Sequence, residues 1–177
     1  GGGGGGEIIA FEAHPENARM IQRNLVRNGF ESRCRVENMA VTDGKQPKVM
    51  LYAGRGEGAS LECNIMGHDI FGQETRALLE ISATSLDHYF EGKPLHFVKM
   101  DIEGAETLAL AGMRSVLRTQ RPVLLVEFHD SAAWGARMEL VLAEYNLYAL
   151  ENGKKILKNP SDETRAYHCL AIPRQLS

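Results

Sequence analysis

Three carboxylates stand at the end of one apolar run near the middle of the chain. The segment FVKMDIEGAETLALAGM, residues 97–113, passes from a strand-like run to Asp101, Glu103 and Glu106. Acids in a first helical turn interact favourably with the helix dipole, by about 0.3–1 kcal/mol each, which accounts for Glu106. It accounts less well for Asp101, which ends the apolar run on the same side as Lys99 and can pair with it. Asp101 and Glu103 are therefore candidates for chemistry.

A fourth acid, Glu12, closes the strand-like run EIIAFE. In a nucleotide-binding α/β unit, an acid at this position can accept hydrogen bonds from both ribose hydroxyls. The alternative is a carboxylate that only interacts with the dipole of the following helix. Asn38 and Met39 end the next run. The Asn38 amide could contact the edge of an adenine, and the Met39 thioether could contact its face. Met39 also suits a core position.

Strand-like and helix-like runs alternate along the chain. This alternation predicts an α/β fold with a mostly parallel sheet. Ligands of such sheets bind outside the carboxyl ends of the strands, so the residues just after each strand matter most. The strand-like runs are residues 7–12, 34–41, 48–53, 79–84, 95–101, 123–129 and 167–172, and the helix-like runs are 15–30, 104–117 and 132–145. The polar strand ends are Glu12-Ala13-His14, Asn38-Met39-Ala40, Asp101-Ile102-Glu103 and Glu127-Phe128-His129.

Composition excludes several classes of protein. The 177 residues suffice for one domain with a real core, at 44% apolar and 24% charged residues. A net charge of −3 gives no reason to expect nucleic acid or an anionic membrane as partner. No apolar run is long enough to span a bilayer. Cys34, Cys63 and Cys169 lack metal-site spacing, so we expect no metal, and they fit the reduced thiols of a cytoplasmic protein.

The motifs together resemble a known family. FVKMDIEGAETLALAGM followed by RPVLLVEFH is similar to the signature of the FkbM-type S-adenosylmethionine-dependent methyltransferases. EIIAFEAHPENARMIQRNLVRNGF, VENMAVTD and ISATSLDHYF agree, so the likeness runs from Glu7 to about Pro173. The resemblance implies a class I fold, a three-layer, Rossmann-like, mostly parallel seven-stranded sheet with an antiparallel strand near the C-terminus. YALENGKKI and YHCLAIP would be its last two strands.

The resemblance also implies S-adenosylmethionine as cofactor and O-methylation of a sugar or another hydroxyl-bearing small molecule. Glu12, with Ala13 beside it, falls at the ribose-binding acid. Asn38, Met39 and Ala40 fall beside the adenine. Asp101 falls near the methionine end and the transferred methyl group.

A hydroxyl nucleophile gains from a nearby general base. His129, after the fifth strand, is the first candidate, because an unperturbed histidine titrates near neutrality. Asp101 or Glu103 is the alternative base. His129 also suits a structural role as the cap of the following helix.

The N-terminus departs from the family pattern. Residues 1–6 are all glycine, where the family has a first strand and a glycine-rich loop that carries an acid. We expect residues 1–6 to be a linker or unidentified residues, residues 7–177 to form an N-terminally incomplete methyltransferase domain, and the sheet to have a gap at its centre. Two alternatives stay open. One is a non-catalytic scaffold domain of the same fold, and the other is a nicotinamide-dependent oxidoreductase, for which no GxGxxG loop is present.

Overall fold

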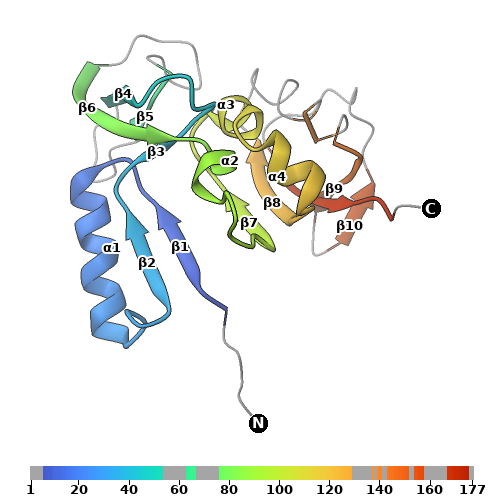
Figure 1. The fold of residues 1–177 in the computed structure, drawn as a ribbon, viewed down its shortest axis with the longest axis horizontal. Helices are drawn as coiled ribbons and strands as arrows, with labels where there is room; N and C mark the ends of the chain where they lie inside the picture. Colours follow the sequence, from blue (N-terminus) through green and yellow to red (C-terminus); the bar gives the residue numbers. More distant parts are fainter. Residues whose placement is uncertain are drawn as a thin grey trace.

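The computed structural model describes residues 6–53, 63–66, 76–128, 137, 139–140, 143–151, 154–157 and 167–175. Within them, strands and helices alternate, and the strands form sheets of two, four and five strands (Figure 1). No helix in this part of the chain is both long and apolar enough to cross a membrane. The molecule is a mixed α/β fold, as the alternation predicted.

The smallest sheet is a parallel pair of strands joined by one helix. It consists of β1 (Ile8–Phe11) and β2 (Cys34–Glu37), with α1 (Pro15–Asn28) between them. The ladder ends where Phe11 lies opposite Glu37. A parallel pair requires such a crossover, which is why the helix lies between its two strands in the sequence.

Both ends of α1 are set by local sequence. His14 precedes the helix, and its Nδ1 accepts a hydrogen bond from the Glu16 N–H at 3.3 Å. Pro15 occupies the first turn, where its missing N–H costs nothing. Gly29 ends the helix at φ 72°, a left-handed conformation that glycine adopts without strain. The predicted start and stop of this helix are confirmed.

The four-stranded sheet has the order β3-β6-β4-β5. Only β3 and β6 run parallel, whereas β4 pairs antiparallel with both β5 and β6. A small core of Ala40, Leu51 and Ile81 lies against it. Its strands are β3 (Ala40–Val41), β4 (Lys48–Ala53), β5 (Cys63–Asn64) and β6 (Arg76–Thr84).

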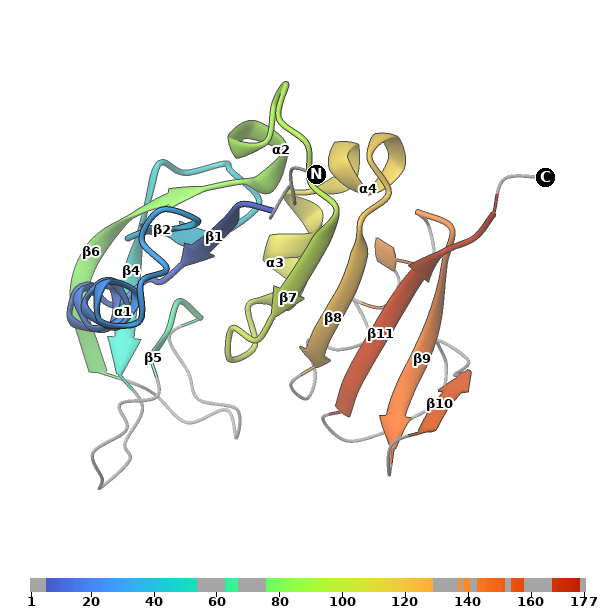
Figure 2. The same cartoon turned by 90° about the horizontal axis from the view of Figure 1, so that it is seen from below.

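The five-stranded sheet has the order β10-β9-β11-β8-β7, and Figure 2 shows these strands side by side. Strands β7 and β8 are parallel, and the remaining neighbours are antiparallel. The antiparallel strand expected near the C-terminus is therefore present as β11. The strands are β7 (Phe97–Met100), β8 (Val123–Phe128), β9 (Tyr145–Glu151), β10 (Lys154–Leu157) and β11 (Tyr167–Pro173).

The main core lies between this sheet and three short helices (Figure 1). The helices are α2 (Leu86–Tyr89), α3 (Glu106–Ala111) and α4 (Arg114–Thr119). Strand β8 alternates buried and half-buried residues, so it presents one face to this core. The largest fully buried side chains of the core include Leu110, Met113, Leu117, Leu124, Phe128 and Tyr145.

The expectation of a single, mostly parallel sheet is wrong for the described strands. Parallel pairing occurs at β1–β2, β3–β6 and β7–β8, and every other pair is antiparallel. A parallel neighbour needs a crossover of a dozen or more residues, usually a helix, which the short β9–β10 connection cannot supply. Where strands follow one another closely, as β9 and β10 do, the chain turns back on itself. The single strand expected over YALENGKKI is accordingly two strands.

The helix expected over residues 104–117 is divided in two. Helix α3 ends before Gly112, and α4 begins after Met113, whose φ of −130° is not helical. The Asp87 carboxylate accepts hydrogen bonds from the N–H groups of Ser115 at 3.0 Å and Val116 at 2.8 Å. These contacts cap α4 from a distant part of the chain, so the periodicity of the segment could not show the break.

Candidate functional site

The end of β1 is a tight turn that fixes one carboxylate. The Glu12 N–H donates to the Glu37 carbonyl at 3.0 Å, which extends the β1–β2 pairing by one bond. Glu12 Oε1 accepts a hydrogen bond from the His14 N–H at 2.7 Å. The half-buried carboxylate therefore lies beside the N-terminus of α1, where the helix dipole favours a negative charge.

Asn38 holds this turn from the neighbouring strand. Its Nδ2 donates to the carbonyl oxygens of Glu12 at 2.9 Å and Ala13 at 3.0 Å. The following residue, Met39, donates its N–H back to the Glu37 carbonyl at 3.0 Å. Of the predicted cofactor-binding residues, the structure thus joins Glu12, Ala13 and Asn38 by hydrogen bonds.

The three apolar residues predicted for this site differ in their environment. Ala40 is 5% exposed and belongs to the small core with Leu51 and Ile81. Ala13 packs against the same core. Met39 is half-buried and lies outside both described cores. Of the three, only Met39 has an apolar side chain that lies outside a core.

A second group of candidates follows β7. Asp101 has a side chain that is 38% exposed, and its Oδ2 lies 3.8 Å from Lys99 Nζ, so the predicted ion pair is present. Such a surface pair contributes little to stability. Glu103 and Gly104 come next with φ angles of 52° and 95°. A left-handed conformation is uncommon for glutamate, which makes this turn a strained one.

Glu106 is an acid whose burial the sequence did not indicate. It opens α3 with 0% exposure, and its Oε1 accepts a hydrogen bond from the Gly104 N–H at 3.3 Å. An acid in a first helical turn interacts with the helix dipole whether it is buried or exposed. The sequence pattern therefore did not reveal the burial of Glu106. The sequence signal that could have been used is the glycine two residues before the acid, because the Gly104 N–H is free to turn back and donate to it.

The candidates thus fall into two groups on separate sheets. Glu12 and Asn38 end the β1–β2 pair, whereas Asp101 and Glu103 follow β7 of the five-stranded sheet (Figure 2). His129, the predicted base, follows β8 in the sequence and lies outside the described residues. Within the described part of the chain, no group of three or more His, Cys, Asp or Glu side chains could hold a metal ion.

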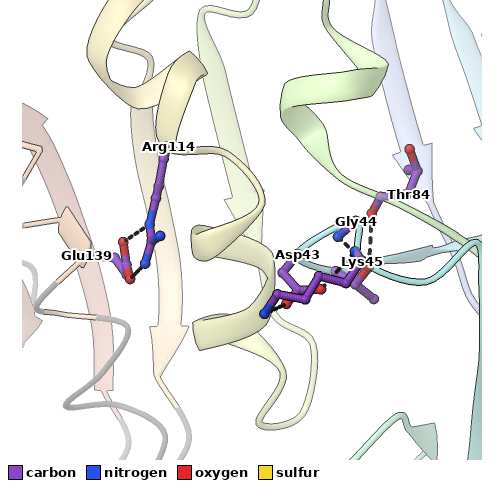
Figure 3. A network of polar contacts seen from close by, with 7 residues as sticks. Asp43, Gly44, Lys45, Thr84, Arg114 and Glu139 are labelled. Carbon is purple, nitrogen blue, oxygen red and sulfur yellow. Dashed lines mark hydrogen bonds and ion pairs between the residues drawn. The ribbon is translucent and has the colours of Figure 1, made fainter.

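Two further polar clusters lie away from these strand ends (Figure 3). Lys45 pairs with Asp43 at 2.7 Å and lowers the pKa of that carboxyl through its hydrogen bonds. Arg114 forms a two-pronged ion pair with Glu139, beside a surface hollow of about 200 Å³. Its hydrogen bonds lower the pKa of Glu139. Because each charge has its partner, both clusters are explained by structure alone.

Comparison with known proteins identifies the type of domain. The family model of the methyltransferase FkbM domain matches residues 2–154. A crystal structure of the methyltransferase FkbM from Methylobacillus flagellatus KT is similar in fold, with a TM-score of 0.57 and 18% sequence identity. The match covers 94% of this chain and 36% of that one, so the chain spans little more than a third of its length. No curated protein matches the chain.

Proposed function

Because the chain belongs to the methyltransferase FkbM family, we propose that it is part of an S-adenosylmethionine-dependent methyltransferase. Residues 7–177 form the methyltransferase domain in this proposal. The acceptor is a hydroxyl group of a sugar or another small molecule. The wider similarity of fold to a solved member of that family supports the assignment.

The observation that carries the proposal is the hydrogen-bonded turn at the ends of β1 and β2. Glu12 Oε1 is occupied by the His14 N–H, and its second carboxylate oxygen has no hydrogen bond within the described residues. A carboxylate oriented in this way can accept hydrogen bonds from the vicinal hydroxyls of a ribose. The half-buried Met39 supplies an apolar surface nearby for an adenine face. These residues fit the adenosine part of the cofactor.

Transfer of the methyl group demands positioning and a route for one proton. Bound S-adenosylmethionine would supply a sulfonium methyl group, and the acceptor oxygen would bond to that methyl carbon in line as the thioether of S-adenosylhomocysteine leaves. Asp101, Glu103 or His129 would accept the proton of the acceptor hydroxyl. Asp101 and Glu103 follow directly from the end of β7, and the unusual backbone of Glu103 and Gly104 sets the direction of that turn.

Calorimetric titration of S-adenosylmethionine and S-adenosylhomocysteine into the full-length protein tests this proposal. Glu12→Gln and Asp101→Asn should each weaken binding by about tenfold, or about 1.4 kcal/mol, through lost hydrogen bonds. Glu16→Gln is the matched control, because Glu16 lies on the exposed face of α1 and pairs with Arg19. A folded wild-type protein that binds neither compound would overturn the proposal and favour a non-catalytic domain.

The base requires its own measurement. His129→Ala should reduce the turnover number while the dissociation constant of S-adenosylhomocysteine stays near that of the wild type. If this variant turns over at the wild-type rate, the assignment passes to Asp101 or Glu103. A parallel titration with a nicotinamide dinucleotide tests the oxidoreductase alternative, which binding of that compound would favour.

A further inference from the structure

Asn38 uses its amide donors on the protein itself. A side-chain amide carries two N–H donors on Nδ2 and one acceptor oxygen. Here Nδ2 donates to the carbonyls of Glu12 and Ala13, which are 26 and 25 residues away in sequence. Only Oδ1 is left to meet a ligand. The expected contact between the amide donors and an adenine edge therefore competes with bonds that already exist.

The side chain of Asn38 continues the pairing of β1 and β2 past the point where the main chains separate. The ladder closes with the Glu12 N–H donating to the Glu37 carbonyl. The main chain of β2 then turns away, because the Met39 N–H also donates to Glu37 and Ala40 enters the next sheet. Beyond Glu37, the Asn38 amide links β2 to the turn at residues 12–14.

One peptide unit connects the Asn38 amide to the Glu12 carboxylate. The Ala13 carbonyl and the His14 N–H belong to the same planar peptide group. Its oxygen accepts from Asn38 at 3.0 Å, and its N–H donates to Glu12 Oε1 at 2.7 Å. Since the group is rigid, fixing its oxygen fixes the direction of its N–H. Asn38 and the Glu12 carboxylate therefore hydrogen-bond to opposite sides of one rigid peptide group.

We infer that Asn38 is a positioning residue that orients the Glu12 carboxylate, through the Ala13–His14 peptide, toward the hydroxyls of a bound ribose. This inference rests on the proposed function, in which Glu12 receives the ribose hydroxyls. Asn38 acts on the ribose without touching it.

A double-mutant cycle on the full-length protein, with S-adenosylhomocysteine as probe, separates positioning from direct contact. Asn38→Ala should weaken binding by about tenfold when Glu12 is present, and by less than about twofold in the Glu12→Gln background. Equal losses in both backgrounds, or no loss in the first, would overturn the inference. Asn28→Ala is the matched control, because its amide also donates to a main-chain carbonyl, that of Asn24 at 2.7 Å, on exposed α1.

A measurement without ligand keeps this inference separate from the proposed function. The backbone amide resonance of His14 reports its hydrogen bond to Glu12. Both Asn38→Ala and Glu12→Gln should move its proton resonance upfield, whereas Asn28→Ala should leave it unchanged. An unshifted His14 resonance in a folded Asn38→Ala protein would overturn the inference. If the wild-type protein does not bind S-adenosylhomocysteine but the His14 resonance still moves in Asn38→Ala, the result counts against the proposed function alone.

Discussion

Tyr89 donates its hydroxyl hydrogen to Glu37 Oε1 at 2.5 Å and so ties α2 to the end of β2. Arg35 Nε approaches the same oxygen at 3.1 Å, and the Tyr89 ring meets Phe11 edge-on at 4.9 Å. Burial and the bond to Glu37 raise the pKa of Tyr89. One aromatic residue thus contacts both strands of the smallest sheet.

Tyr89→Phe should lower the free energy of unfolding by about 1–2 kcal/mol, because a hydrogen bond to a charged group is lost while the ring contacts stay. Urea denaturation followed by circular dichroism measures the change. Tyr89→Leu removes the ring contact with Phe11 as well and should cost more. A Tyr89→Phe protein as stable as the wild type would show that the bond to Glu37 contributes nothing.

Asp87→Ala should destabilise the protein by about 1–2 kcal/mol, the usual cost of removing a helix cap. Its two carboxylate oxygens accept from the N–H groups of Ser115 and Val116, which open α4. Asp87→Asn keeps one acceptor and should lose less. Ser85→Ala is a matched control, because Ser85 caps α2 locally through the His88 N–H at 3.2 Å. Chemical denaturation of the three variants measures these effects. If only Ser85→Ala were destabilised, the role of Asp87 as the cap of α4 would be contradicted.

Gly112→Ala should cost about 3 kcal/mol or more, or prevent folding, because overpacking against backbone has no easy relief. An added Cβ would lie 2.0 Å from the Thr42 carbonyl oxygen and 2.9 Å from its carbon. Gly92→Ala is the control, because Gly92 has φ 70° but open space around it, so only backbone strain of about 1–2 kcal/mol is added. Thermal melting of both variants tests the difference, and equal losses would refute the steric explanation.

Tyr145→Phe should change stability at alkaline pH. The buried Tyr145 hydroxyl donates to the Pro122 carbonyl at 2.9 Å, and burial raises the pKa of Tyr145 to about 12 from an ordinary value of 10. The neutral phenol is favoured in the folded state, so its stabilising effect is complete below pH 10 and is lost as the pH rises from 10 to 12.

Removing this phenol should make the stability curve flatter between pH 10 and 12, by about 2 kcal/mol. At pH 7 the variant should be less stable by about 1 kcal/mol, because the Pro122 carbonyl loses its donor. Denaturation at several pH values, with tyrosinate absorbance recorded in parallel, measures both effects. Tyr52→Phe in β4 is the control, and a Tyr145→Phe curve parallel to the wild type would contradict the assignment.

Local features of the fold were predictable, and features made by distant residues were not. The bounds of β4 and the start and stop of α1 follow from residues inside each segment, such as Pro15 and Gly29. The division of the helix after β7 depends on Asp87, which is far away in sequence. The pairing directions failed for the same reason, since they depend on contacts between strands far apart in sequence, such as β8 and β11.

The candidate site shows the same division. Position after a strand was enough to select Glu12 and Asn38, which the structure joins by a hydrogen bond. The direction of the Asn38 amide, toward the protein, could not be read from residue type, because an amide donates equally well to a ligand or to a carbonyl. The burial of Glu106 was missed because its first-turn position has a sufficient explanation without it.

The separation of the β1–β2 pair from the other sheets has a consequence for hydrogen exchange. Within the described residues, β1 and β2 form ladder bonds only with each other, whereas β8 and β11 lie inside a five-stranded sheet. Amides of a small unit exchange through local opening, at a lower free energy than global unfolding. The amides of β1, α1 and β2 should therefore take up deuterium together and before those of β8 and β11. Glu12 and Asn38 follow these two strands, so we expect them to open with this unit.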